Sequence, residues 1–232
     1  MLQANISVVP IRAEASDKAE MVSQLLYGEE YEVLESQEKW LKIKAAFDGY
    51  IGWIDKKQSS TDTFDNTSFV VSKYALVNVG VQKHLLSIGA RLPLHYEQID
   101  SIGEVSTQEQ DIISTAKLFL ETPYLWGGKS VFGIDCSGFT QQVFKLAGFK
   151  LPRDAYQQAE IGEKVAFGEH QANDLAFFAS NDRITHVGIL TDKDHIIHAS
   201  GKVRIDQFND KGIIQEESKE LTHHLIAIKR IR

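Results

Sequence analysis

One cysteine and two histidines have residue types and positions that suit nucleophilic catalysis. Cys136 is the single cysteine of the 232-residue chain, so an internal disulfide cannot account for it. It lies in the segment YLWGGKSVFGIDCSGF, and His186 in RITHVGIL and His198 in HIIHAS follow it. A thiol that transfers an acyl group needs a base, and a third group that orients the base. The three residues therefore indicate acyl-transfer chemistry at Cys136.

The predicted position of Cys136 in the first turn of a helix has two consequences for this chemistry. The N–H groups and the positive end of the helix dipole favour thiolate over thiol, so we expect a lowered pKa for Cys136. The same N–H groups can receive the oxyanion of a tetrahedral intermediate. The glycines at 127, 128 and 133 are expected to let the preceding chain lie close to a substrate.

The two histidines lie in predicted strands that are joined by a turn around residues 192–194. If these strands pair antiparallel, the two imidazoles come close together. His186 would then take the thiol proton and later protonate the leaving amine, while His198 would fix the tautomer of His186. The remaining histidines have no motif around them and are interpreted as surface or structural groups: His84, His95, His170, His195, His223 and His224.

The elements that must position these residues form a predicted α+β domain over residues 105–232. Ser-Thr-Gln-Glu at 106–109 matches a capping box and predicts a helix over 107–120. A second helix is expected to begin near Cys136 and to end at Gly148, because apolar residues recur at helical spacing between them. The runs DLAFFAS, ITHVGILTD, HIIHAS and HLIAIKRI then read as strands, and helices followed by strands indicate the α+β class.

The first part of the chain reads as β structure. Residues 1–58 contain five short β-rich runs, and Asp48-Gly49 between two of them predicts a hairpin with a type I′ turn. Their order resembles a small all-β bacterial SH3-like module. Residues 59–104 are either a β-rich bridge or a degenerate second SH3-like unit, and the sequence leaves both interpretations open.

Composition excludes some partners. The net charge of -7 and the pI near 5.6 argue against an electrostatic nucleic-acid binder. Neither a basic segment followed by an apolar run at the start nor any window of ~20 apolar residues is visible, so no membrane association is expected. If Met1 is the native start, a cytoplasmic location is expected, which suits an unpaired thiol; if it is not, export is the alternative.

Six motif blocks together resemble the NlpC-type cell-wall cysteine peptidases over about residues 107–232. The blocks are YLWGG (124–128), GIDCSGF (133–139), LPR (151–153), NDLAFF (173–178), HVGI (186–189) and HAS (198–200). The resemblance implies a papain-like fold, with Cys136 as nucleophile, His186 as base and His198 as the orienting third residue. It implies neither a cofactor nor a metal.

With an SH3-like module in front, the chain resembles the γ-D-glutamyl-L-diamino acid endopeptidases of muropeptide recycling. This implies hydrolysis of the γ-D-glutamyl bond to diaminopimelate or lysine in free muropeptides that begin with L-Ala. The implied substrate contacts are Tyr124, Asp135, Ser137 and Arg153. Asp135 would bind an ammonium, and Tyr124 and Ser137 would contact the substrate or the oxyanion. Arg153 would pair with the D-Glu carboxylate, or else form a structural salt bridge.

Glu20 and Tyr50 of the SH3-like module are candidates for reading the substrate amine. The alternative is that Glu20 is a solvated loop charge and Tyr50 a packing aromatic. For the whole protein, the alternatives to a peptidase are an inactive cell-wall peptide-binding protein and an amidase or acyltransferase on the same scaffold. A zinc protein is disfavoured because the chain has no Cys-x-x-Cys or His-x-x-x-His pair to anchor a metal. A monomer is expected.

Overall fold

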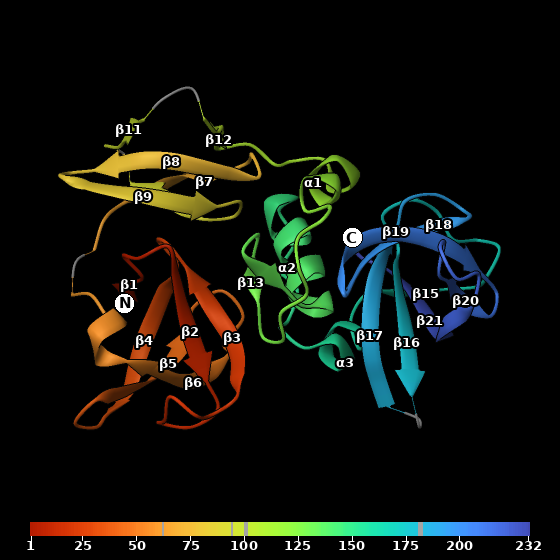
Figure 1. Cartoon of the computed structure of the whole chain (residues 1–232), viewed down its shortest axis with the longest axis horizontal. Coiled ribbons are helices and arrows are strands. Elements are labelled where there is room, and N and C mark those ends of the chain that lie inside the picture. The colour runs from red at the N-terminus through yellow and green to blue at the C-terminus, as the bar shows by residue number, and fades with distance from the viewer. Residues whose placement is uncertain (62, 94, 100–101, 181–182) are drawn as a thin grey trace. The chain divides into compact units, whose positions relative to one another are not determined.

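The chain was analysed as a computed structural model that describes residues 1–61, 63–93, 95–99, 102–180 and 183–232. It divides into two units, and the polypeptide passes between them more than once (Figure 1). The first unit contains Met1–Glu109 and Leu125–Gly133, and the second contains Gln110–Tyr124 and Ile134–Arg232. The segment just before Cys136 therefore folds as part of the first unit.

Six strands form one sheet at the start of the first unit. They are β1 (Leu2–Gln3), β2 (Val8–Arg12), β3 (Met21–Leu26), β4 (Glu30–Ser36), β5 (Trp40–Ala45) and β6 (Ile51–Asp55), in the order β1-β4-β5-β6-β2-β3. A short 3-10 helix, η1 (Lys56–Gln58), follows. Alternate side chains of β2 and β5 are buried, among them Val9, Ile11 and Ile43, and they build one apolar core. The sequence predicted one strand fewer.

The hairpin predicted at Asp48-Gly49 is confirmed, but the prediction of a type I′ turn is wrong. Strands β5 and β6 pair antiparallel up to Lys44 and Ile51. Gly49 has φ +75°, whereas Asp48 is not in the left-handed region that a type I′ turn also requires at its first central residue. The connection is longer than two residues, because the last backbone pair is Ala45 N–H to the Tyr50 carbonyl and residues 46–49 lie between them. Within it the Asp48 carboxylate accepts a hydrogen bond from the backbone N–H of Tyr50.

Residues 59–104 are rich in β structure and build a core of their own. The strands of this region are β7 (Asn66–Val70), β8 (Tyr74–Val79), β9 (Gln82–Ser87), β10 (Arg91–Pro93) and β11 (Glu97–Gln98), and β12 (Val105–Ser106) follows just beyond it. They form two three-stranded sheets, ordered β10-β7-β12 and β11-β8-β9. Buried side chains of this region, such as Val77 and Leu86, pack with Tyr27. This part of the chain thus extends the first unit through an apolar core.

The second unit combines three helices with a seven-stranded sheet (Figure 1). The helices are α1 (Ile112–Leu118), α2 (Cys136–Leu146) and α3 (Ala155–Gln158); the two short strands β13 (Lys129–Ser130) and β14 (Gly133–Ile134) lie between α1 and α2 in the sequence. The sheet consists of β15 (Glu163–Val165), β16 (Leu175–Ser180), β17 (Arg183–Leu190), β18 (His195–Ser200), β19 (Lys202–Asn209), β20 (Gly212–Ile214) and β21 (Leu221–Arg230). Its order is β15-β21-β16-β17-β18-β19-β20, and β20 also pairs with β21, which closes six strands on themselves. The α+β prediction is confirmed.

The start of the first helix differs from the prediction. Helix α1 begins at Ile112, and the Asp111 carboxylate caps it by accepting from the N–H of Ser114 at 2.8 Å. Ser106 lies instead at the end of β12, where it pairs with Phe69 of β7. The predicted capping box is therefore wrong, because Ser106 is part of a strand that pairs with β7 and so cannot cap a helix. Helix α2 does begin at Cys136, and Gly148 has φ +83° beyond its end, as predicted. Among the helices in the described ranges, none is long and apolar enough to cross a membrane.

Candidate active site

Cys136 is the first residue of α2 and lies against strand β17. The Asp135 carboxylate caps the helix by accepting from the N–H of Gly138 at 2.7 Å. The Cys136 Sγ lies 4.0 Å from the carbonyl oxygen of Thr185, and its pKa is also affected by the N–H of Val187. The thiol is thus placed beside the two residues that flank His186 in the sequence.

The expectation of a lowered pKa at Cys136 is wrong. Burial raises the pKa of the thiol to about 12, and the negative charge of Asp135 raises it further. The backbone N–H groups of Val187 and Ser137 and the Arg153 guanidinium lower it, but they do not outweigh burial. The helix does begin at Cys136 as predicted, but burial and the neighbouring carboxylate keep the thiol protonated at neutral pH.

The two predicted histidines are adjacent, as expected. Strands β17 and β18 pair antiparallel with Gly188 opposite His198. His186 Nε2 and His198 Nδ1 are 2.8 Å apart, and both side chains are buried. Burial lowers the pKa of His186 well below its ordinary value, with smaller contributions from His198 and His223. His186 is therefore a neutral imidazole at neutral pH, which is the form that a general base requires.

Asp206 on β19 extends this line of side chains and was not predicted from the sequence. Its Oδ2 lies 2.9 Å from His198 Nε2, and its side chain is 2% exposed. Burial alone would raise the pKa of Asp206, but hydrogen bonds from His198, the N–H of Glu216 and Arg204 lower it below the ordinary value. The available signal was the alternation in VRIDQF, which places Arg204 and Asp206 on one face of the strand after HIIHAS.

A third histidine packs on the predicted base. The His223 ring on β21 stacks on His186 with centroids 4.2 Å apart and an interplanar angle of 30°. Burial, followed by the charge of His198, lowers the pKa of His223 to about 4. The interpretation of His223 as a surface or structural group missed this contact. Of the other histidines, His84 and His170 are buried and His95, His195 and His224 are exposed.

Three of the four predicted substrate contacts form one buried cluster. Arg153 Nη2 lies 2.6 Å from Asp135 Oδ2, and Arg153 Nη1 donates to Asp135 Oδ1 at 3.0 Å. Arg153 Nη1 also donates to the Ser137 hydroxyl at 2.9 Å. Because the guanidinium is buried and holds the carboxylate with two hydrogen bonds, the geometry favours the structural salt bridge for Arg153.

Tyr124, the fourth predicted contact, is half-buried near the nucleophile. Burial raises the pKa of Tyr124 to about 12, and the charges of Cys136 and Asp135 add to this increase. The phenol therefore keeps its proton at neutral pH and can donate a hydrogen bond.

The glycines before Cys136 serve internal packing. Gly127 has φ +76°, and a Cβ there would lie 2.3 Å from the carbonyl oxygen of Met21 in the same unit. A Cβ on Gly133 would lie 2.6 Å from the Leu125 side chain. At these two positions the protein itself requires glycine, and the expected approach of this segment to a substrate stays a prediction.

The two candidates in the SH3-like module have different surroundings. Glu20 is exposed and accepts a hydrogen bond from the indole N–H of Trp126, within the first unit. Tyr50 is partly buried against the apolar core of the six-stranded sheet, which favours its interpretation as a packing aromatic. The role of Glu20 toward a substrate amine stays a prediction.

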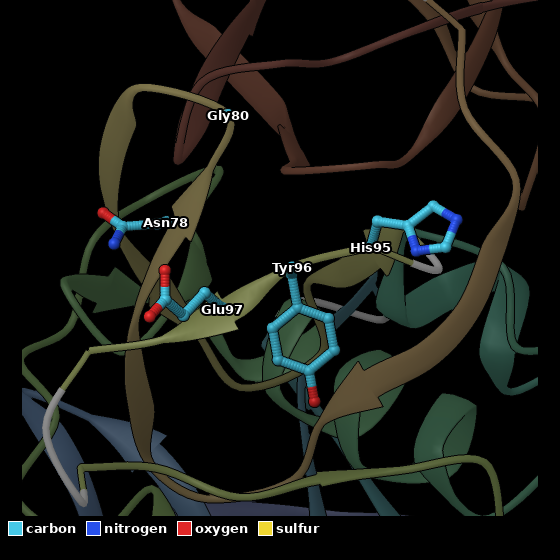
Figure 2. Close-up of a pocket in the computed structure, with 5 residues that line it drawn as sticks. All are labelled: Asn78, Gly80, His95, Tyr96 and Glu97. Atoms are coloured by element: carbon cyan, nitrogen blue, oxygen red, sulfur yellow. The ribbon is translucent and has the colours of Figure 1, made fainter.

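A separate pocket lies in the first unit and contains none of the predicted site residues. It is lined by Asn78, Gly80, His95, Tyr96 and Glu97. Figure 2 shows the Asn78 and Glu97 side chains at one end and His95 at the other. Within the ranges that the structure covers, no group of three or more His, Cys, Asp and Glu side chains is placed to hold a metal ion.

Comparisons with known proteins agree with this geometry. Residues 121–221 match the NlpC/P60 family, and residues 11–58 match the bacterial dipeptidyl-peptidase Sh3 domain. Two relatives are named Gamma-D-glutamyl-L-lysine dipeptidyl-peptidase. The one from Bacillus subtilis (strain 168) is 34% identical over 76% of this chain and 71% of its own length. The one from Bacillus cereus (strain ATCC 10987 / NRS 248) is 30% identical over 84% of this chain and 72% of its own length.

A solved structure has the same fold over nearly the whole chain. The crystal structure of an NlpC/P60 family protein from Bacillus cereus ATCC 10987 matches with a TM-score of 0.83 at 22% identity, over 99% of this chain and 98% of that one. The chain belongs to the NlpC/P60 family, and its amino-terminal part is a bacterial SH3-like domain. The predicted class, a cell-wall cysteine peptidase preceded by an SH3-like module, is confirmed.

Proposed function

We propose that this protein hydrolyses the γ-D-glutamyl-L-diamino acid bond of peptidoglycan-derived peptides, with Cys136 as nucleophile and His186 as base. The observation that carries the proposal is the buried thiol beside β17, together with the His186–His198 pair at 2.8 Å. The names of the two relatives support the substrate class, with lysine as the diamino acid.

The first half of the reaction forms a thioester. His186 Nδ1 takes the thiol proton while Cys136 Sγ attacks the γ-carbonyl carbon of D-glutamate. The oxyanion accepts hydrogen bonds from N–H groups in the first turn of α2 and from the Tyr124 hydroxyl. When the intermediate collapses, the C–N bond breaks and His186 gives its proton to the leaving amine of the diamino acid. Because thiol and imidazole both start neutral, the proton moves during the attack itself.

The second half releases the acyl group. Water loses a proton to His186 and attacks the thioester, the C–S bond breaks, and the proton passes to the departing sulfur. For a peptide that begins with L-Ala, the product is L-Ala-γ-D-Glu. The chemistry needs no cofactor.

The buried cluster of Asp135, Ser137 and Arg153 supports substrate binding in this scheme. Arg153 and the helix N-terminus hold Asp135 in a defined position beside the nucleophile. We propose that polar groups of the substrate bind the Ser137 hydroxyl and the Asp135 carboxylate. Arg153 then keeps its ion pair with Asp135 and contributes to binding by holding that carboxylate in position.

The test is a peptide assay. L-Ala-γ-D-Glu-L-Lys and L-Ala-γ-D-Glu-diaminopimelate, each free and N-acetylated, are incubated with the protein and the products are read by mass spectrometry. We expect L-Ala-γ-D-Glu from the free peptides with wild type and none with Cys136→Ala. Equal cleavage of free and acetylated peptides would contradict a requirement for the free amine, and cleavage of none of the four would contradict the proposed function.

A further inference from the structure

We propose that Asp206 is a positioning residue for the reaction, which sets the tautomers of His198 and His186 and so determines which nitrogen of His186 acts as base. The inference rests on the proposed function for the role of His186. It concerns a residue that is outside the motif blocks and lies eight positions along the chain from the predicted third residue.

Strand register places the three side chains on one diagonal. His198 on β18 is paired with Gly188 on β17 and with Arg204 on β19. Paired residues share a face of the sheet, and residues two apart in one strand also share it. His186 and Asp206 are therefore the diagonal neighbours of His198 on its two sides. The sheet itself brings the three groups into line.

Glycine at 188 makes the first diagonal contact possible. A Cβ at this position would lie 2.8 Å from the Cβ of His198 and 2.8 Å from Cδ1 of Ile196. Because Gly188 has no side chain, the His198 imidazole occupies the space beside it and reaches His186 Nε2 at 2.8 Å.

The proton positions follow from the acceptor at the end of the line. An ionised carboxylate only accepts hydrogen bonds, so His198 Nε2 must carry a proton toward Asp206 Oδ2 at 2.9 Å. Neutral His198 then has a lone pair on Nδ1 and accepts from His186 Nε2. Neutral His186 in turn keeps its single proton on Nε2, which leaves Nδ1 free to take the thiol proton. With both imidazoles neutral and Asp206 ionised, any other arrangement sets two lone pairs or two protons against each other in a buried site.

The contacts of Asp206 hold it in this role. Oδ1 accepts from Arg204 Nη2 at 2.9 Å and from the N–H of Glu216 at 2.9 Å, and Arg204 Nε lies 2.8 Å from Oδ2. His198 and Asp206 are 1% and 2% exposed, so water does not compete strongly for their hydrogen bonds. The carboxylate thus stays ionised and keeps one oxygen toward His198.

The substitution Asp206→Asn tests the inference with little change in shape. Oδ1 accepts two hydrogen bonds, from Arg204 Nη2 and the N–H of Glu216, whereas Arg204 Nε lies close to Oδ2 without donating a hydrogen bond to it. The amide oxygen of asparagine therefore takes the Oδ1 position, which turns the amide NH₂ toward His198 Nε2. His198 would then carry its proton on Nδ1, and His186 would be driven to the Nδ1–H tautomer that cannot act as base. In the serine-protease triad the equivalent change costs about 10⁴-fold in kcat through the wrong tautomer. We expect a fall of at least ~100-fold here.

Two measurements distinguish a positioning role of Asp206 from a merely structural one. Long-range ¹H–¹⁵N NMR of the imidazoles should show Nε2–H for both His186 and His198 in wild type, and Nδ1–H in Asp206→Asn. Alkylation of Cys136 by iodoacetamide reports on the thiol and its base without any peptide, and it should slow in the variant. Cys136 is the single cysteine, so the label is unambiguous. Neither measurement uses a peptide, so both test the role of Asp206 even if the peptide assay contradicts the proposed function.

The matched control is Asp192→Asn. Asp192 also faces a histidine, with Oδ1 2.9 Å from His195 Nδ1, but both side chains are about half exposed. We expect kcat, alkylation rate and the tautomers of His186 and His198 to match wild type. Nδ1–H on His198 in wild type would overturn the inference, whether or not the Asp206→Asn variant folds. Unchanged tautomers and a rate within threefold of wild type in that variant would overturn it too.

Discussion

At the scale of single residues, burial outweighs the helix start at Cys136. A helix N-terminus favours a thiolate by an amount that is typically below about 2 kcal/mol, whereas burying a charge without full compensation costs several kcal/mol. The neighbouring Asp135 carboxylate adds repulsion. Cys136 is therefore a protonated nucleophile that depends on its base, and His186 is kept neutral by the same burial.

This protonation state predicts an unusual pH profile for thiol alkylation. With the pKa of Cys136 raised to about 12, the thiolate fraction grows tenfold per pH unit through the alkaline range. The iodoacetamide rate of wild type should still be rising at pH 10, measured by mass spectrometry. The same chain in urea is the control and should level off above its ordinary pKa of about 8.5. A rate in the folded protein that levels off at the same pH as in urea would refute the raised pKa.

At the scale of elements, strands β17, β18 and β19 align the imidazoles and the carboxylate. The diagonal depends on register, because a shift by one residue would turn each side chain to the opposite face. An atom added at Gly188 would disturb this arrangement, since the neighbouring His198 Cβ is held in place by the pairing of its own strand.

The substitution Gly188→Ala should therefore separate His198 from His186. We expect kcat to fall by ~10-fold or more while the chain still folds, because a misplaced catalytic group is costly even at small displacements. Steady-state kinetics and circular dichroism measure the two effects. Gly168→Ala is the control, because an added Cβ there meets nothing within 4 Å; its φ of +95° should cost stability and leave kcat unchanged. Equal kcat in both variants would contradict the steric argument.

At the scale of the whole molecule, the chain segment before the nucleophile is built into the first unit. Lys129 is 2% exposed and its Nζ lies 3.2 Å from Glu29 Oε2, and the Lys129 N–H donates to Gln24 Oε1 at 2.8 Å. The N–H of Val131 donates to the Ser87 hydroxyl at 3.0 Å. These contacts come from both β-rich parts of the unit, so residues 125–133 pack against the SH3-like region and against the strands that follow it.

The buried ion pair between Lys129 and Glu29 should contribute strongly to the free energy of unfolding. Glu29→Gln leaves the Lys129 ammonium buried without its counter-charge, and losing one partner of such a pair typically costs about 3–5 kcal/mol. Urea unfolding should show this loss. The control is Glu121→Gln, which breaks the exposed pair with Lys202 and should cost less than about 1 kcal/mol. Equal costs for the two variants would show that Lys129 is solvated.

The sequence by itself determined the parts of this protein that depend on local pattern and on motif. The helix that begins at Cys136, the strands that carry His186 and His198, and the glycine that follows the helix were all predicted, because each depends on periodicity or on a backbone preference. The capping box at residues 106–109 failed because a strand partner distant in sequence competed for Ser106.

The tertiary structure alone decided the properties that depend on burial and on distant neighbours. The raised pKa of Cys136 comes from surroundings that no local pattern records. The roles of Asp206 and His223 depend on which strands become neighbours, and β19 and β21 reach the histidines only through the closed sheet. Desolvation and diagonal side-chain contacts are long-range effects, so they appear only once the chain has folded.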